Sequence, residues 1–276
     1  MTESWQLKLD RAEHHLDEIK RQMRSYSDSH PYIAVRQPSG SNRQRHVWRY
    51  ALKVTNQPDP MLAIVIGDFI HNVRCALDHI VVACVPPNRR SRASFPIEHR
   101  DIWATHDDGT FVVKDDDARS RFDRAMRGID QRALTVIEEL QPYQNPPDEV
   151  RVHPLRVLSR LENVDKHRSL VVLGAGVLDG TSTVTARGNR LEQDAWGFRH
   201  DGAEVAKFEV HREILPNLDE TEVDVQVDGP VEVSIVIGTA KDDPDFGNYN
   251  AAVFLDGMLN TTREKVIPLL VPFVRD

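Results

Sequence analysis

The hydrophobic pattern of this chain changes character part-way along its length. In the first 168 residues, apolar side chains mostly recur three or four positions apart, as Leu9, Ala12, Leu16 and Ile19 do, and this spacing predicts amphipathic helices. The same spacing returns near the C-terminus. We therefore expect helices over residues 3–26, 60–85, 118–127, 130–140, 152–164 and 248–270.

Strands are predicted where apolar and polar residues alternate. Val223, Val225 and Val227 alternate with polar residues, and turns rich in Gly or Asp separate several such segments. Residues 47–54 also read as a strand, which we expect to pair with residues 32–35. The later strands should form one antiparallel meander, with strands at 170–173, 182–186, 204–211, 222–227 and 231–237.

These elements predict an α+β fold, in which an N-terminal helical bundle is followed by a small antiparallel β-sheet and a C-terminal helix. Residues 1–168 should form the bundle with a short β excursion, and residues 169–240 the meander. Residues 241–276 should form a C-terminal helix that packs back on the bundle or the sheet. At 276 residues, the chain is long enough to bury a substantial core.

Composition and charge narrow the class of protein. The chain is 40% hydrophobic and 28% charged, as soluble globular proteins are, and its net charge of −8 disfavours non-specific binding along nucleic-acid phosphates. Cys75 and Cys84 lie on one predicted helix, about 13 Å apart along its axis, too far for a disulfide. The N-terminus is charged and no apolar run is long enough to cross a membrane, so we expect a cytoplasmic protein without membrane contacts.

The helix expected over residues 60–85 carries an unusual polar face. At about 100° per residue, its apolar side chains gather on one broad face, and side chains of functional type lie opposite. The stretch contains no Lys and no Glu, which a plain solvated face would carry. The core face consists of Ile66, Phe69, Ile70, Val73, Leu77, Ile80 and Cys84. The opposite face consists of Asp68, His71, Asn72, Cys75, Asp78 and His79, with Arg74 at the boundary.

Two non-catalytic interpretations of this face are open. In the first, its role is structural: Arg74 and Asp78, four residues apart, form a helix ion pair worth about 0.2–0.5 kcal/mol, and the histidines pack against another helix. In the second, the face is a dimer or partner interface of an interaction protein that has no catalytic activity.

A metal site is another interpretation, because imidazole, thiolate and carboxylate groups all suit zinc or iron. His71, Cys75 and His79 span about 12 Å along the helix, so one ion cannot bind all three. A site would need one neighbouring pair of them and a ligand from another helix, such as Glu162 or His167.

The string Arg74-Cys75-Ala76-Leu77-Asp78-His79 supports a more specific interpretation. It resembles the Arg-x4–6-His motif of the HEPN superfamily, whose helical bundles include many metal-independent endoribonucleases. Cys75 stands where that family usually carries a polar residue. The surrounding pattern, with Gly67-Asp68, His71-Asn72 and the later Asp165 to Arg168, is similar to that of a bacterial family of unassigned function.

The resemblance implies an activity and a partner. Arg74 would stabilise phosphate charge and His79 would act as acid or base on a ribose 2′-hydroxyl, with Asp78 as the third catalytic candidate. Arg74 and His79 are roughly 140° apart around the helix, so one protomer alone would present them poorly to one phosphate. The implied protein is a homodimer of toxin or defence type that cleaves RNA or binds a nucleotide and needs no cofactor.

A second cluster lies at the expected junction between the bundle and the sheet. Lys166, His167 and Arg168 end a predicted helix, where cations are favoured by the helix dipole. Our working hypothesis is that this end packs beside the 60–85 helix. The three cations would then bind substrate together with His71 and Asn72.

Overall fold

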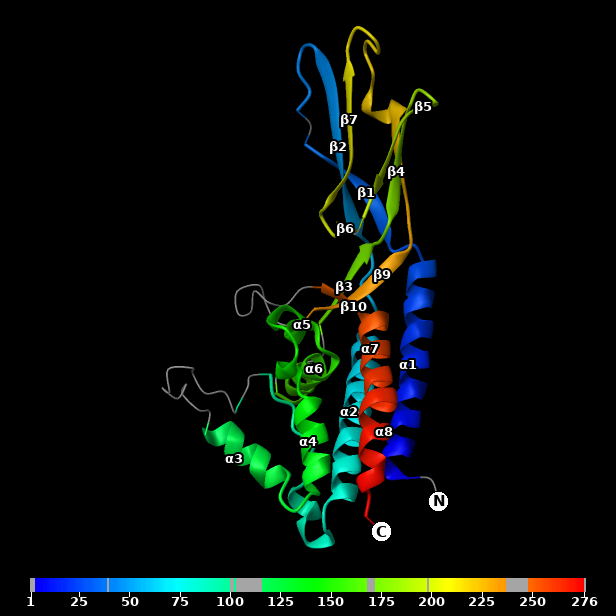
Figure 1. The fold of residues 1–276 in the computed structure, drawn as a ribbon. Helices are drawn as coiled ribbons and strands as arrows, with labels where there is room; N and C mark the ends of the chain where they lie inside the picture. The colour runs from blue at the N-terminus through cyan, green and yellow to red at the C-terminus, as the bar shows by residue number, and fades with distance from the viewer. Residues whose placement is uncertain are drawn as a thin grey trace, which may run out of the picture.

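The computed structural model describes residues 3–38, 40–99, 102, 116–167, 172–197, 199–236 and 248–275. The molecule is elongated, with helices at one end and most strands at the other, and both chain ends lie at the helical end (Figure 1). We call the helical end the bundle and the opposite end the β lobe. The predicted α+β class is confirmed.

Two long antiparallel helices, α1 (Ser4–Asp28) and α2 (Pro60–Cys84), form the centre of the bundle, within two residues of their predicted bounds. α2 begins where the Asp59 side chain accepts a hydrogen bond from the Met61 N–H, a standard helix cap. At its other end, Arg275 donates to the carbonyls of Ala83 and Cys84, so the C-terminal tail satisfies two groups that a helix end leaves unpaired.

Shorter helices complete the bundle, and all of them except α5 contribute residues to one hydrophobic cluster with α1 and α2. The cluster includes Phe69 of α2, Leu158 of α6 and Leu255 of α7, each fully buried. Asp130 caps α4, accepting from the Arg132 N–H at 2.8 Å. The shorter helices are α3 (Asp116–Ala125), α4 (Gln131–Glu139), α5 (Pro147–Val152), α6 (Pro154–His167), α7 (Ala251–Asn260) and α8 (Ile267–Leu270).

The C-terminal helix, predicted over residues 248–270, contains an irregular turn. Between α7 and α8 the chain forms a π-helical segment at Thr261–Val266. Pro268 lies two residues after this segment and lacks the N–H that a regular helix would use, so the wider turn absorbs the disruption. The buried Thr262 donates its hydroxyl to the Met258 carbonyl at 2.9 Å, which secures the segment.

The strands form three small antiparallel sheets in the described part of the chain. The sheet orders are β1-β2-β7, β5-β4-β8 and β10-β9-β3-β6. The first two sheets make up the β lobe, and the third lies next to the bundle (Figure 1). The strands are β1 (Tyr32–Gln37), β2 (Arg45–Val54), β3 (Val172–Val177), β4 (Gly180–Ala186), β5 (Asn189–Trp196), β6 (Arg199–His200), β7 (Glu204–His211), β8 (Val223–Asp228), β9 (Val231–Val236) and β10 (Asn248–Asn250).

The strand pairing differs from the predicted single meander, although β1 pairs with β2 as expected. β7 pairs with β2, and β8 pairs with β4, so neighbours in the sheet are not neighbours in sequence. Alternation of apolar residues sets which face of a strand is buried, but it does not select the partner. The domain division at residue 168 stays a prediction, and strands from both sides of it share the β1-β2-β7 sheet.

A bent two-stranded ribbon connects the bundle to the β lobe. β3 continues into β4, and β8 continues into β9, with matching breaks where the Leu178 N–H donates to the Pro230 carbonyl. Gly229 has a φ of 156°, and a Cβ there would lie 2.6 Å from a Val177 methyl group. Only glycine fits this crossing of the two strands.

The two sheets of the β lobe share a second hydrophobic cluster. His46 stacks on Trp48 at 5.0 Å between ring centroids, and Trp48 stacks on Phe208 at 5.4 Å. The Ser182 hydroxyl donates to the Val205 carbonyl at 2.6 Å and joins the sheets. The ring atoms Nε2 of His46 and Nε1 of Trp48 are buried and have no hydrogen-bond partner in the described residues.

Candidate functional site

The predicted core face of α2 is confirmed, since all seven residues assigned to it are at most 1% exposed. The opposite side of the helix retains a stripe of exposed and half-buried residues that lie three or four positions apart. Met61 and Ile64 are 53% and 40% exposed, and the stripe continues through polar residues toward the C-terminal end. Its members, which we call the α2 stripe, are Met61, Ile64, Asp68, His71, Cys75, His79 and Val82.

Arg74 does not lie in the α2 stripe but fastens α2 to a neighbouring helix. Its Nη2 lies 3.0 Å from Oδ1 of Asp78, and its Nε lies 3.4 Å from Oε2 of Glu162 on α6. The side chains of Arg74 and Glu162 are only 15% and 14% exposed. Two carboxylates therefore neutralise the guanidinium in a partly buried position, and a phosphate would have to displace one of them.

Asp78 positions a loop segment as well as binding Arg74. Its Oδ1 accepts a hydrogen bond from the Phe95 N–H at 2.8 Å, and the Phe95 side chain is fully buried. This arrangement gives the carboxylate an architectural role, because it satisfies a backbone donor that would otherwise be buried without a partner. The ion pair between Arg74 and Asp78, considered from sequence as a structural interpretation, is present.

Gln141 holds the same segment from the opposite side, and sequence reasoning did not identify it. Gln141 is fully buried; its Oε1 accepts from the Glu98 N–H, and its Nε2 donates to the Pro96 and Ile137 carbonyls. A single glutamine after a helix is an ordinary local pattern. The role of Gln141 becomes evident only from its contact with a segment more than 40 residues away in the sequence.

Asn72 was predicted on the open polar face, and that placement is wrong. The side chain is only 8% exposed because α1 covers it. Its Nδ2 donates to the Asp68 carbonyl at 2.8 Å, and its Oδ1 accepts from Lys8 at 3.5 Å. Asn72 lies at the edge of the polar face, where the sequence alone does not show how far the neighbouring helix extends.

His79 is partly exposed and is not joined to Arg74 by any hydrogen bond in the described residues. Its Nδ1 is buried and has no hydrogen-bond partner within the same residues. The two motif residues thus face different surroundings: Arg74 faces α6, and His79 belongs to the α2 stripe. The structure does not bring them together within one protomer.

The basic cluster after α6 falls largely outside the described residues. Arg168 is not described, and for Lys166 and His167 only the helical backbone is. Glu162, one helical turn before Lys166, is held by Arg74, so α6 packs against α2 close to the start of this cluster.

A metal site on α2 would need a third ligand, and the described residues do not supply one. Cys75 Sγ lies 3.4 Å from Nε2 of the exposed His71, but Glu162 is committed to Arg74. No group of three or more His, Cys, Asp or Glu suited to a metal ion occurs in the described part of the chain. Cys84 is buried, its thiol lies 3.6 Å from the Leu270 carbonyl, and burial raises its pKa to about 11, which makes it an unreactive thiol.

Of the described helices, α2 is long and apolar enough to cross a membrane by length and composition alone. More than half of its most apolar 18-residue window, 56%, is buried inside the protein, which is typical of the core helix of a bundle. The cytoplasmic location stays a prediction. Comparisons with protein-family models, curated proteins and solved structures found no match to this chain.

Proposed function

We propose that this protein is a homodimeric interaction protein that self-associates through the α2 stripe. The observation that carries the proposal is the order of side chains along the stripe, which is nearly symmetrical about Val73. Two copies related by a two-fold axis present the same surface to each other, so each stripe must complement itself.

An antiparallel pairing of two stripes meets that requirement. Because each pair is equidistant from Val73, Ile64 of one copy lies opposite Val82 of the other, and His71 lies opposite Cys75. Asp68 lies opposite Asp78, next to His79. Apolar pairs then flank a polar centre that contains both carboxylates and imidazoles. Buried polar groups at such a seam fix its register and orientation.

The contacts of Arg74 and Asp78 support an interaction role over catalysis by these two residues. Both side chains are used within the protomer, to join α2 to α6 and to the segment that begins at Phe95. These contacts hold α2 rigidly, and a rigid scaffold lowers the entropy cost of association.

Sedimentation of the wild-type chain and of Ile64→Arg tests the proposal. Ile64 is exposed, so arginine should leave the protomer folded but place two charges at the seam, and the dimer should dissociate. Val253→Arg is the matched control, because Val253 is 65% exposed on α7, away from the stripe. A wild-type chain that is monomeric, or an Ile64→Arg variant that stays dimeric, would remove the proposal.

A second candidate is a metal-independent endoribonuclease or nucleotide-binding protein, and His79 is the residue that favours it. A partly exposed histidine with one unpartnered ring nitrogen has the chemistry of a general acid or base. Arg74 would serve only after substrate phosphate replaced Asp78 or Glu162 on the guanidinium.

RNA cleavage in the presence of a chelator tests this candidate. His79→Gln should lower the cleavage rate by about 10²–10⁴-fold, the usual contribution of a general acid or base. His14→Gln, at an exposed histidine of α1, is the control. If wild-type protein leaves RNA intact, or if His79→Gln cleaves it at the wild-type rate, the nuclease candidate is excluded, and the dimer proposal is unaffected.

A further inference from the structure

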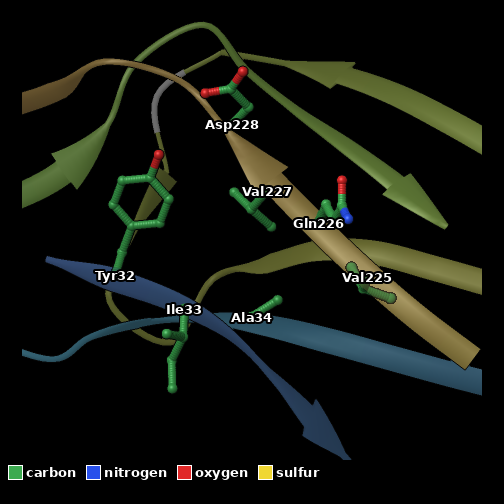
Figure 2. A pocket seen from close by; sticks show the side chains of 7 residues that line it. All are labelled: Tyr32, Ile33, Ala34, Val225, Gln226, Val227 and Asp228. Atoms are coloured by element: carbon green, nitrogen blue, oxygen red, sulfur yellow. The ribbon is translucent and has the colours of Figure 1, made fainter. Parts of the chain in front are cut away.

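A groove runs along the side of the β lobe between the edge strands of its two sheets, as Figure 2 shows. β1 contributes Tyr32, Ile33 and Ala34, and β8 contributes the residues from Val225 to Asp228. The volume of the groove is about 500 Å³. It lies apart from α2 and uses none of the residues of the candidate site described above.

The β8 side of the groove offers unpaired backbone groups. The Arg187 N–H donates to the Glu222 carbonyl at 2.9 Å, just before β8 begins, which makes these two residues a hydrogen-bonded pair. Hydrogen-bonded and non-hydrogen-bonded pairs alternate along an antiparallel ladder. The N–H and C=O groups of Val223, Val225 and Val227 therefore point away from β4, and no described strand pairs with that edge.

The β1 side follows the same rule. The Thr55 N–H donates to the Pro31 carbonyl at 2.8 Å, at the end of the β1–β2 ladder. By the same alternation, the backbone groups of Ala34 point away from β2 and toward the groove. Two free strand edges thus face one opening, whereas most proteins cover or shorten such edges.

Side chains along β8 divide into two chemical classes. Val225 and Val227 are half-buried and line the groove, where they pack against the hydrophobic cluster of the β lobe. Asp224, Gln226 and Asp228 alternate with them and are exposed, and Gln226 and Asp228 also border the groove. An added strand would place every second side chain in the groove and the others beside the two carboxylates.

We propose that this groove binds an extended polypeptide segment, in which basic and apolar residues alternate, by adding it as a strand to β8. Main-chain hydrogen bonds to Val223, Val225 and Val227 supply the affinity, and the alternating side chains supply the specificity. Lysines or arginines four residues apart lie opposite Asp224 and Asp228, which are themselves four apart. Apolar residues between them cover the half-buried valines.

Binding of a fluorescein-labelled peptide, Lys-Val-Lys-Val-Lys-Val-Lys, to the full chain tests the proposal by fluorescence anisotropy. The wild-type protein should bind it, and a Glu-Val peptide of the same length should not bind. Asp224→Lys/Asp228→Lys should weaken binding by about tenfold or more, because two attractive pairs become repulsive. The control is Asp123→Lys/Glu139→Lys, at two exposed acidic residues of α3 and α4 in the bundle, which makes the same change in charge away from the groove and should keep wild-type affinity.

The proposed main-chain hydrogen bonds to β8 can be tested separately by hydrogen exchange and by N-methylated peptides. On peptide binding, hydrogen exchange should slow at the amides of Val223, Val225 and Val227, which are otherwise open to water. A peptide N-methylated on the amides that face β8 should lose binding, while one methylated on the alternate amides should keep it.

Three results would overturn the inference: no binding by the alternating peptide, equal loss in both double variants, or no slowing at the β8 amides. A fourth result would also overturn the inference: the chain self-associates, Asp224→Lys/Asp228→Lys abolishes the self-association, and no peptide binds. The β8 edge would then be assigned to a second copy of the chain. None of these results bears on the α2 dimer, because the Ile64→Arg and Val253→Arg pair is tested without peptide.

Discussion

The bundle and the β lobe bury their interiors with different chemistry. In the bundle, most residues of the shared cluster are aliphatic or phenylalanine, and Phe69 is one of its fully buried members. The β lobe buries His46 and Trp48, each with a ring nitrogen that has no described partner, and it presses Trp196 onto Gly180. The stability of the bundle therefore comes from the volume and area of its buried apolar side chains. The stability of the β lobe depends on a few close contacts between large rings and the backbone.

The largest loss of stability should come from removing a large side chain from the bundle core. Phe69→Ala removes a ring that is 0% exposed, and the loss of buried area plus the cavity should lower the free energy of unfolding by about 3–5 kcal/mol. Urea denaturation followed by helical circular dichroism measures it. Val253→Ala, at a side chain that is 65% exposed, should change stability by less than about 0.5 kcal/mol. Similar losses for both variants would contradict a volume-based core.

The close fit in the β lobe can be broken with a single methyl group. A Cβ on residue 180 would lie 2.1 Å from Cη2 of Trp196, so Gly180→Ala should lower the free energy of unfolding by about 1–3 kcal/mol through overpacking. Tryptophan fluorescence during denaturation measures the change. At Gly197, beside the same tryptophan, a Cβ would meet nothing within 4 Å, so Gly197→Ala should be close to neutral. A neutral Gly180→Ala would mean that Trp196 is not tightly packed.

The ion pair between Arg74 of α2 and Glu162 of α6 should contribute less to the free energy of unfolding than the packing of either hydrophobic core. Glu162→Gln removes one carboxylate from Arg74 but leaves Asp78 in place, so the expected loss is about 1 kcal/mol. Glu139→Gln, at an exposed glutamate of α4, is the control. A loss equal to that of the control would show that Asp78 alone satisfies the guanidinium.

The smallest expected effect is a dependence on pH that both regions share. Burial lowers the pKa of His46, as does nearby Arg212, and a hydrogen bond that His46 makes to the Leu215 backbone opposes the shift. Burial, with a smaller effect from Lys265, also lowers the pKa of His153 in the bundle. Each histidine binds a proton more readily when unfolded. Stability is therefore complete above about pH 6.5 and falls as the pH drops from there toward each folded-state pKa.

Two variants separate the contributions of these histidines. His46→Phe should reduce the loss of stability between about pH 7.5 and pH 5.5, as monitored by tryptophan fluorescence in the β lobe. His153→Asn should do the same when helical dichroism is monitored. The asparagine keeps an acceptor for the Leu155 N–H, which His153 Nδ1 accepts at 3.3 Å. An unchanged pH dependence in both variants would assign the effect to other groups.

The bundle was the more predictable region because its signals are local. The bounds of α2 and the burial of the seven residues predicted for its core face follow from helical spacing, which depends only on residues within a few turns. The exception is Asn72, whose burial depends on α1. Helical spacing places a residue on a face but does not state where the next helix begins to cover it.

In the β lobe and the candidate site, the missing information is long-range. The strand positions of β7 and β8 were predicted closely, but their partners were not, because β7 pairs with β2 across most of the chain. Similarly, the contacts of Asp78 with Phe95 and of Gln141 with Glu98 join segments that no periodic pattern relates. The Arg74–Asp78 pair, four residues apart on one helix, is the part of the site that local spacing does predict.

The pairing of β2 with β7 also determines when the first sheet can form during synthesis of the chain. Arg45 pairs with His211, so the β1–β2 hairpin leaves the ribosome roughly 150 residues before its third strand exists. At about 5–20 residues per second, that interval lasts on the order of 10–30 seconds. During this time one edge of β2, including Trp48, has no partner. The β1-β2-β7 sheet can therefore be completed only after α1 and α2 have both been synthesised.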